Sequence, residues 1–141
     1  MSTVLLTWNP DKWAWDDHDE EIEQAQKAPV AMNWSVATQA VAPGDRAFLL
    51  RQGRERGIVA SGHIRSAPSP GAHWDGSGTT TEYVDVEFDV ILSVEERLPI
   101  EVLQQRVKSV HWTPQQSGTK VRPPADDELE ELWREHLAQV R

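Results

Sequence analysis

The chain has 141 residues, a formal net charge of −9 and no cysteine, and seven of its residues are tryptophan. This length is typical of a single domain, residues 1–141, which can bury a core without crosslinks. The lack of cysteine excludes disulfides, thiolate metal sites and cysteine nucleophiles. No signal-like segment follows Met1 and no stretch of about 18 apolar residues occurs, so we expect a cytoplasmic protein without membrane contact.

The N-terminal third of the sequence predicts a strand, a helix and a loop. Residues 3–8 (TVLLTW) are apolar and β-branched, which favours a strand. Residues 15–27 predict a helix that begins at Asp16 or Asp17 and carries acids in its first turn. Residues 33–45 are mixed in character and poor in charge, which favours a loop with one helical turn.

The middle of the sequence predicts a hairpin and one long strand. Residues 46–52 and 57–66 are mainly apolar runs joined by a turn, with Gly62 at a bulge or a close backbone approach. Residues 67–81 are rich in Pro, Gly, Ser and Thr, which predicts a loop. In residues 82–92 apolar and polar side chains alternate, which indicates a strand with one buried face.

The C-terminal part predicts two helices separated by a strand and a loop. Residues 98–106 predict a short helix, and residues 109–121 a strand followed by a loop. Residues 123–140 carry an apolar stripe at helical spacing that includes Trp133, so we expect this tryptophan in the core. Four or five strands and three helices without βαβ alternation indicate an α+β fold with a small, curved, mostly antiparallel sheet.

Acidic residues are concentrated in two segments, with seven of the 23 in residues 11–23 and six in residues 126–135. Other segments contain no acid at all: 1–10, 24–44, 56–74 and 102–125. If these segments share one face of the fold, that face is neutral to basic.

Motifs for catalysis, cofactors and metals are missing from the sequence. The five histidines form no HxxxH or HxH pair, and His18 and His136 are expected to be solvated on the two acidic helices. There is no GxSxG nucleophile motif, no phosphate loop and no dinucleotide fingerprint. We therefore expect a binding domain rather than an enzyme, with no cofactor and no metal ion.

Six segments of the sequence form a recognisable series. They are LLTWNPDKWAW (5–15), NWSVATQ (33–39), PGDRAFLLRQGRERGIVASGHI (43–64), HW (73–74), YVDVEFDVIL (83–92) and HWTPQQSG (111–118). In order and spacing they resemble the EVE domain of the PUA-like superfamily, in the form that is fused to HNH nucleases in modification-dependent restriction systems. The resemblance covers nearly the whole chain, and residues 44–62 are its most specific part.

The resemblance implies a PUA-like fold, a curved β pseudo-barrel of about five strands flanked by about three helices. EVE domains are regarded as readers of modified bases in nucleic acid and are related to YTH domains. In YTH domains the Trp of a Trp-Ser pair forms one wall of the pocket and the Ser backbone lies at the base edge, and the pair Trp34-Ser35 is similar. The predicted base-binding residues are Trp8, Asn9, Trp34, Ser35, Trp112, Gln115 and Ser117.

The tryptophans near the N-terminus are predicted to differ in role. Trp8 ends the first strand beside Asn9, where the fold that the resemblance implies lines its pocket. Trp13 and Trp15 are predicted to fasten the first helix to the barrel. Phosphate contacts around the mouth are expected from Arg51, Arg54, Arg56, Lys108 and Lys120.

Two departures from the family limit what the resemblance implies. Free-standing EVE proteins carry KSEP where this chain has TWNP (7–10), so the modification that they prefer does not carry over. No HNH motif follows the domain, so we expect no nuclease activity and a chain that acts alone or with a separate effector such as a nuclease. We also expect a monomer.

The predicted function is binding of nucleic acid that carries a modified base, with modified cytosine or methylated adenine in DNA as the first candidates. The base would be flipped into an aromatic pocket, and Trp34→Ala is predicted to remove the preference for the modified base with the fold intact. Two alternatives stay open. One is a protein that binds a free modified nucleoside or nucleotide, which the charge of −9 favours. The other is an ASCH-like amidohydrolase, whose GxKxxExR-like string is missing here.

Overall fold

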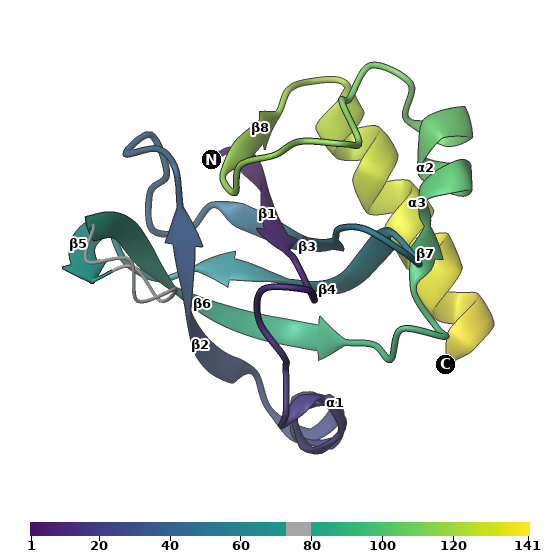
Figure 1. Ribbon diagram of the computed structural model, residues 1–141. Coiled ribbons are helices and arrows are strands. Elements are labelled where there is room, and N and C mark those ends of the chain that lie inside the picture. Colours follow the sequence, from purple (N-terminus) through teal and green to yellow (C-terminus); the bar gives the residue numbers. More distant parts are fainter. Residues whose placement is uncertain (73–79) are drawn as a thin grey trace.

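One mixed sheet and three helices make up the part of the chain that the computed structural model describes, residues 1–72 and 80–141 (Figure 1). The strands are β1 (Thr3–Trp8), β2 (Val30–Val36), β3 (Arg46–Arg51), β4 (Gly57–Ile64), β5 (Ser69–Ala72), β6 (Thr80–Ile91), β7 (Leu98–Pro99) and β8 (Thr119–Val121). The helices are α1 (His18–Lys27), α2 (Ile100–Arg106) and α3 (Ala125–Val140). Within these ranges no helix combines the length and the apolar character needed to cross a membrane.

The sheet has the strand order β2-β6-β4-β3-β1-β8, with β5 paired to β6 and β7 paired to β4. Every pair is antiparallel except β1 with β3, which is parallel. The predicted α+β class and mostly antiparallel sheet are confirmed. The predicted number of strands is wrong, because the described residues form eight.

The central strands are buried on both faces, so apolar side chains follow one another without interruption. In β3, Ala47 and Leu49 join one apolar cluster, whereas Phe48 and Leu50 join another on the opposite face. The first cluster also holds tryptophans from the N-terminal segment, and the second lies under α2 and α3. Figure 1 shows these two helices together and α1 apart from them. Trp133 is 2% exposed in the second cluster, as predicted.

Three local predictions are wrong. The sequence predicts a loop with one helical turn over residues 33–45, but the first residues of this segment belong to β2 and pair with β6. Residues 109–121 form a loop followed by the short strand β8, which is the reverse of the predicted order. The predicted loop 67–81 contains β5 and the start of β6, and its residues His73 and Trp74 lie outside the described part.

Gly62 lies at the predicted irregularity of β4. The β4–β6 register shifts between Ser61 and Gly62, and a side chain at Gly62 would overlap the carbonyl oxygen of Glu87. Glycine is therefore required here by the close approach of two backbones.

The two helical histidines are half-buried, which corrects the expectation that they are solvated. Nε2 of His18 lies 2.8 Å from the Leu92 carbonyl oxygen, and Nε2 of His136 lies 2.6 Å from that of Glu96. Each ring also stacks on a tryptophan, His18 on Trp15 and His136 on Trp133. The two histidines thus help to join α1 and α3 to the rest of the domain.

Candidate functional site

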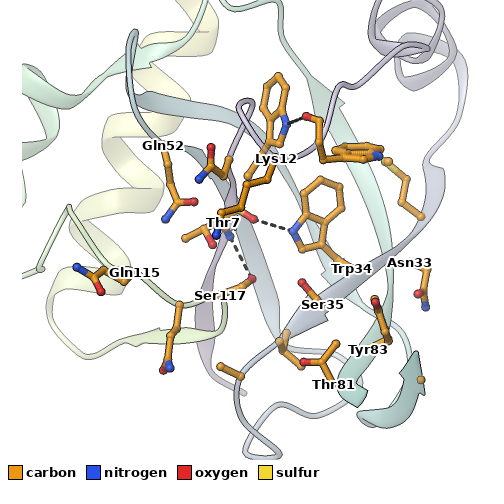
Figure 2. Close-up of a pocket in the computed structure, with 18 residues that line it drawn as sticks. Thr7, Lys12, Asn33, Trp34, Ser35, Gln52, Thr81, Tyr83, Gln115 and Ser117 are labelled. Atoms are coloured by element: carbon orange, nitrogen blue, oxygen red, sulfur yellow. Dashed lines mark hydrogen bonds between the residues drawn. The ribbon is translucent and has the colours of Figure 1, made fainter. Parts of the chain in front are cut away.

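A pocket of about 1050 Å³ opens where the free edge of β2 faces the end of β1 and the loop 111–118 (Figure 2). Its volume is just above the usual range for ligand sites, roughly 300–1,000 Å³. Aromatic rings and amide side chains dominate its lining. They are Trp8, Trp13, Trp34 and Tyr83 for the rings, and Asn9, Asn33, Gln52, Gln115 and Gln116 for the amides.

Trp34 forms a fixed wall of this pocket. It lies on β2 and is 7% exposed, and its Nε1–H donates a hydrogen bond to the Thr7 carbonyl oxygen at 2.9 Å. Its ring meets those of Trp13 and Phe88 edge to face, with centroids 5.4 and 6.2 Å apart. With its one polar group bonded and its ring packed against two others, this indole offers a fixed apolar surface to a ligand.

Trp8 and Asn9 lie at the end of β1, as predicted, and both line the pocket. The Trp8 Nε1–H donates to the carbonyl oxygen of Trp13 at 3.0 Å, which fixes this second ring. The Asn9 Oδ1 accepts from the backbone N–H of Asp11 at 3.0 Å. Because a backbone N–H can only donate, the amide orientation of Asn9 is set, and its Nδ2 group makes no hydrogen bond with a described residue.

Trp13 and Trp15 have different roles, since Trp15 holds α1 and Trp13 also lines the pocket. Trp15 stacks on His18 with centroids 4.3 Å apart and donates from Nε1 to Glu21 of α1 at 3.0 Å, in keeping with the predicted role of holding this helix. Trp13 stacks on Trp15 at 5.9 Å but also lines the pocket and is only partly buried. It is a pocket residue that the sequence reasoning missed.

The free edge of β2 follows from its pairing with β6. Asp85 is the β6 partner of Asn33, and its backbone groups bond to Arg65 and Ser66 on the side away from β2. Asn33 and Asp85 therefore form a non-hydrogen-bonded pair of the antiparallel ladder. The backbone N–H and C=O of Asn33 point to the other edge of β2.

Ser35 follows two residues later and presents its backbone to the same edge. Further along, Ala37 donates its N–H to the Ser117 carbonyl oxygen at 2.8 Å, which places that edge opposite the loop 111–118. Within the described part of the chain, the N–H and C=O of Ser35 have no hydrogen-bond partner. One backbone donor and one acceptor are thus available to a ligand beside Trp34.

Hydrogen bonds hold the loop 111–118 against the pocket. The Ser117 Oγ accepts from the backbone N–H of Thr7 at 3.1 Å, and Gln52 donates from Nε2 to the Pro114 carbonyl oxygen at 2.9 Å. Gln115 and Gln116 lie between these anchors, and their exposed side chains make no hydrogen bond with any described residue. The predicted residues Gln115 and Ser117 therefore both line the pocket. The Gln115 side chain makes no hydrogen bond with a described residue, whereas Ser117 fixes the loop through its bond with Thr7.

Trp112 is not part of the pocket, in contrast to its predicted place in the aromatic cage. It is 3% exposed in the second apolar cluster, and its Nε1–H donates to the Val107 carbonyl oxygen at 2.9 Å. Its side chain therefore belongs to the core, in the same cluster as Leu103 of α2.

Of the five side chains predicted to contact phosphates, three interact with other groups of the protein. The Arg51 guanidinium lies 5.4 Å from the Trp8 ring centroid and donates to the Arg54 carbonyl oxygen. Arg56 donates to the Trp112 carbonyl oxygen at 3.5 Å, and the Lys120 ammonium lies 3.9 Å from the Asp45 carboxylate. Arg54 and Lys108 are exposed, and their side chains have no ion-pair partner in the described residues.

Among the described residues that line the pocket, none is acidic and Lys12 alone carries a formal charge. The described residues also contain no cluster of three or more His, Asp or Glu that could hold a metal ion. The pocket is therefore equipped to bind a flat, polar, neutral or anionic ligand by stacking and hydrogen bonds.

No protein-family model matches the chain, and no curated protein is significantly similar to it in sequence. Among solved structures it is similar to the NMR structure of Rpa0253 from Rhodopseudomonas palustris, with a TM-score of 0.50 and 18% identity over 95% of this chain and 92% of that one. It is also similar to the crystal structure of Atu2648 from Agrobacterium tumefaciens, with a TM-score of 0.49 and 14% identity over 96% of this chain and 93% of that one. At 18% identity the first likeness concerns the fold alone.

Proposed function

We propose that this chain is an EVE-type reader domain that binds a modified base of a nucleic acid in the pocket beside Trp34. The observation that carries the proposal is the combination of two fixed indole walls with a free backbone donor and acceptor at Ser35. A nucleobase is flat and has a polar edge, so it matches both features at once. The proposed role is recognition without catalysis.

The energetics of the pocket suit a base taken out of its stack. Flipping a base out of a duplex costs a few kcal/mol, and stacking on an aromatic side chain returns about 1–3 kcal/mol per base. Burial of an added methyl group contributes roughly 0.8 kcal/mol more. Because Trp8 and Trp34 are already held by hydrogen bonds, little of this gain is spent on ordering the rings.

The PUA-like pseudo-barrel is the architecture that fits this proposal. In the order of paired strands, β2 stands at one end of the sheet and β8 at the other. Ala37, which follows β2, donates its N–H to the carbonyl oxygen of Ser117, which lies just before β8, so these two ends of the sheet are linked. A sheet whose ends approach in this way forms a pocket at the gap between them. The likeness to Rpa0253 supports the fold over nearly the whole chain and carries no information on the ligand.

Binding to a panel of oligonucleotides tests the proposal. The panel contains methylated, hydroxymethylated and glucosylated cytosine and methylated adenine, in single and double strands, each beside its unmodified counterpart. We expect at least one modified oligonucleotide to bind about tenfold or more tightly than its counterpart, because stacking and methyl burial add in the pocket. Equal affinity for all modified and plain oligonucleotides would contradict the proposal.

A matched pair of variants links that preference to the pocket. Trp13→Ala removes a partly buried ring that lines the pocket, and Ile22→Ala removes a partly buried side chain that packs on the same apolar cluster from α1. The preference for the modified base is expected to be lost in Trp13→Ala and kept in Ile22→Ala.

A second candidate function is binding of a free modified nucleoside or nucleotide. The observation that favours it is the engagement of Arg51, Arg56 and Lys120 inside the protein, which leaves few cations for a polymer backbone. The dependence of affinity on salt separates the two functions, since counterion release accompanies only the binding of a polyanion.

A further inference from the structure

Lys12 is the one formal charge among the described residues that line the pocket. Its side chain is exposed and has no ion-pair partner among the described residues, unlike Lys120, which faces Asp45. Figure 2 shows Lys12 between Gln52 and Trp34, among the side chains that line the pocket. An ammonium group that lines a pocket and has no counter-ion among the described residues is available to an anionic group of a ligand.

The backbone that carries Lys12 is held in place. The N–H groups of Lys12 and Trp13 both donate to the Asn9 carbonyl oxygen at 3.1 Å, and Asp11 donates to the Asn9 side chain at 3.0 Å. This turn follows directly from β1, so it fixes the point from which the lysine side chain extends. Only the flexible side chain has to be ordered when a ligand binds.

We propose that Lys12 binds a phosphate of the ligand, so that the pocket recognises a nucleotide unit, base and phosphate together, in preference to a nucleoside. This inference rests on the proposed function, because it takes the base to lie against Trp34. A volume of about 1050 Å³ leaves room for the sugar and phosphate beside the base. The phosphate is either the monoester of a free nucleotide or the diester of a polynucleotide, and both present the same charged oxygens to an ammonium group.

Affinities of three kinds of probe test this assignment. They are N6-methyl-2′-deoxyadenosine and 5-methyl-2′-deoxycytidine, their 5′-monophosphates, and short single-stranded oligonucleotides that carry each modified base once. Lys12→Gln removes the charge at an exposed position. Lys27→Gln removes the same charge at the exposed C-terminal end of α1 and serves as the matched control.

We expect Lys12→Gln to weaken binding of a phosphate-bearing probe about fivefold to tenfold and to leave nucleoside binding unchanged, as for the loss of one charge-assisted contact. The Lys27→Gln variant is expected to bind all three kinds of probe as the wild type does. A loss seen with the 5′-monophosphate assigns the phosphate to a free nucleotide. A loss confined to the oligonucleotide assigns it to the polymer backbone.

Two results would overturn the assignment, and they are distinguishable. If some probe binds but Lys12→Gln and Lys27→Gln bind it equally, Lys12 has no phosphate role and the pocket still binds a base. If no nucleoside, monophosphate or oligonucleotide binds the wild type, the proposed function fails and the ligand class inferred here fails with it.

Discussion

At the scale of single residues, Trp34 both lines the pocket and belongs to the core, with 7% of its surface exposed. Trp34→Ala would leave a cavity beside Trp13 and Phe88 and leave the Thr7 carbonyl oxygen without its donor. We expect the free energy of unfolding, measured by urea denaturation, to fall by about 3–5 kcal/mol. The burial of Trp34 thus predicts a loss of stability where the sequence alone predicts an intact fold.

The partly exposed Trp13 provides the comparison for that prediction. Trp13→Ala removes less buried surface and breaks no indole hydrogen bond with a described residue, so its loss of stability should be less than half as large. If Trp34→Ala and Trp13→Ala lower the free energy of unfolding equally, the deeper burial of Trp34 does not contribute the predicted extra stability. The smaller loss is also why Trp13→Ala is the cleaner variant for binding measurements.

At the scale of elements, strands with unbroken apolar runs could be predicted from sequence and β2 could not. In β2 the exposed positions are Ala31 and Asn33 rather than charged residues, so the alternation of polar and apolar side chains is weak. The three residues of β8 are too few to give any pattern. The sequence predicts the bounds of α2 and α3 to within two residues, because a proline directly precedes each helix.

The same contrast applies to the site. The resemblance brought Trp34 and Ser35 into the prediction, but which edge of β2 is free depends on its pairing with Asp85, about 50 residues away. No local pattern in the sequence reports such a pairing. Trp112 was misplaced for a similar reason, since the direction of its side chain is set by packing under α2.

Loop 111–118 makes a testable contribution as an element. Beyond Leu5, β1 has no partner in β8, and the N–H of Thr7 is satisfied by the Ser117 hydroxyl instead. Ser117→Ala is therefore expected to lower the free energy of unfolding by about 1 kcal/mol or more, measured by urea denaturation. Ser109→Ala, at an exposed position before the loop without a hydrogen bond to the described residues, should have no comparable effect. Equal stability of the two variants would show that the loop is not anchored through Ser117.

At the scale of the whole molecule, a net charge of −9 coexists with a pocket whose described lining has no acidic residue. Exposed cations without an ion-pair partner among the described residues include Lys12 in the pocket lining, together with Arg54 and Lys108. These side chains are available to contact a nucleic-acid backbone. If all three neutralise phosphates, the logarithm of the binding constant for a modified oligonucleotide should fall with the logarithm of salt concentration with a slope of about −2 to −3.

A salt titration checks this slope, with the uncharged modified nucleoside as the control ligand, whose affinity should not change. A protein with a net charge of −9 repels those parts of the polymer that lie outside the pocket, so the affinity is expected to gain little from added oligonucleotide length. An oligonucleotide affinity that is independent of salt would rule out backbone contacts by these cations. The pocket would then bind the base alone, and the free nucleoside would become the favoured ligand.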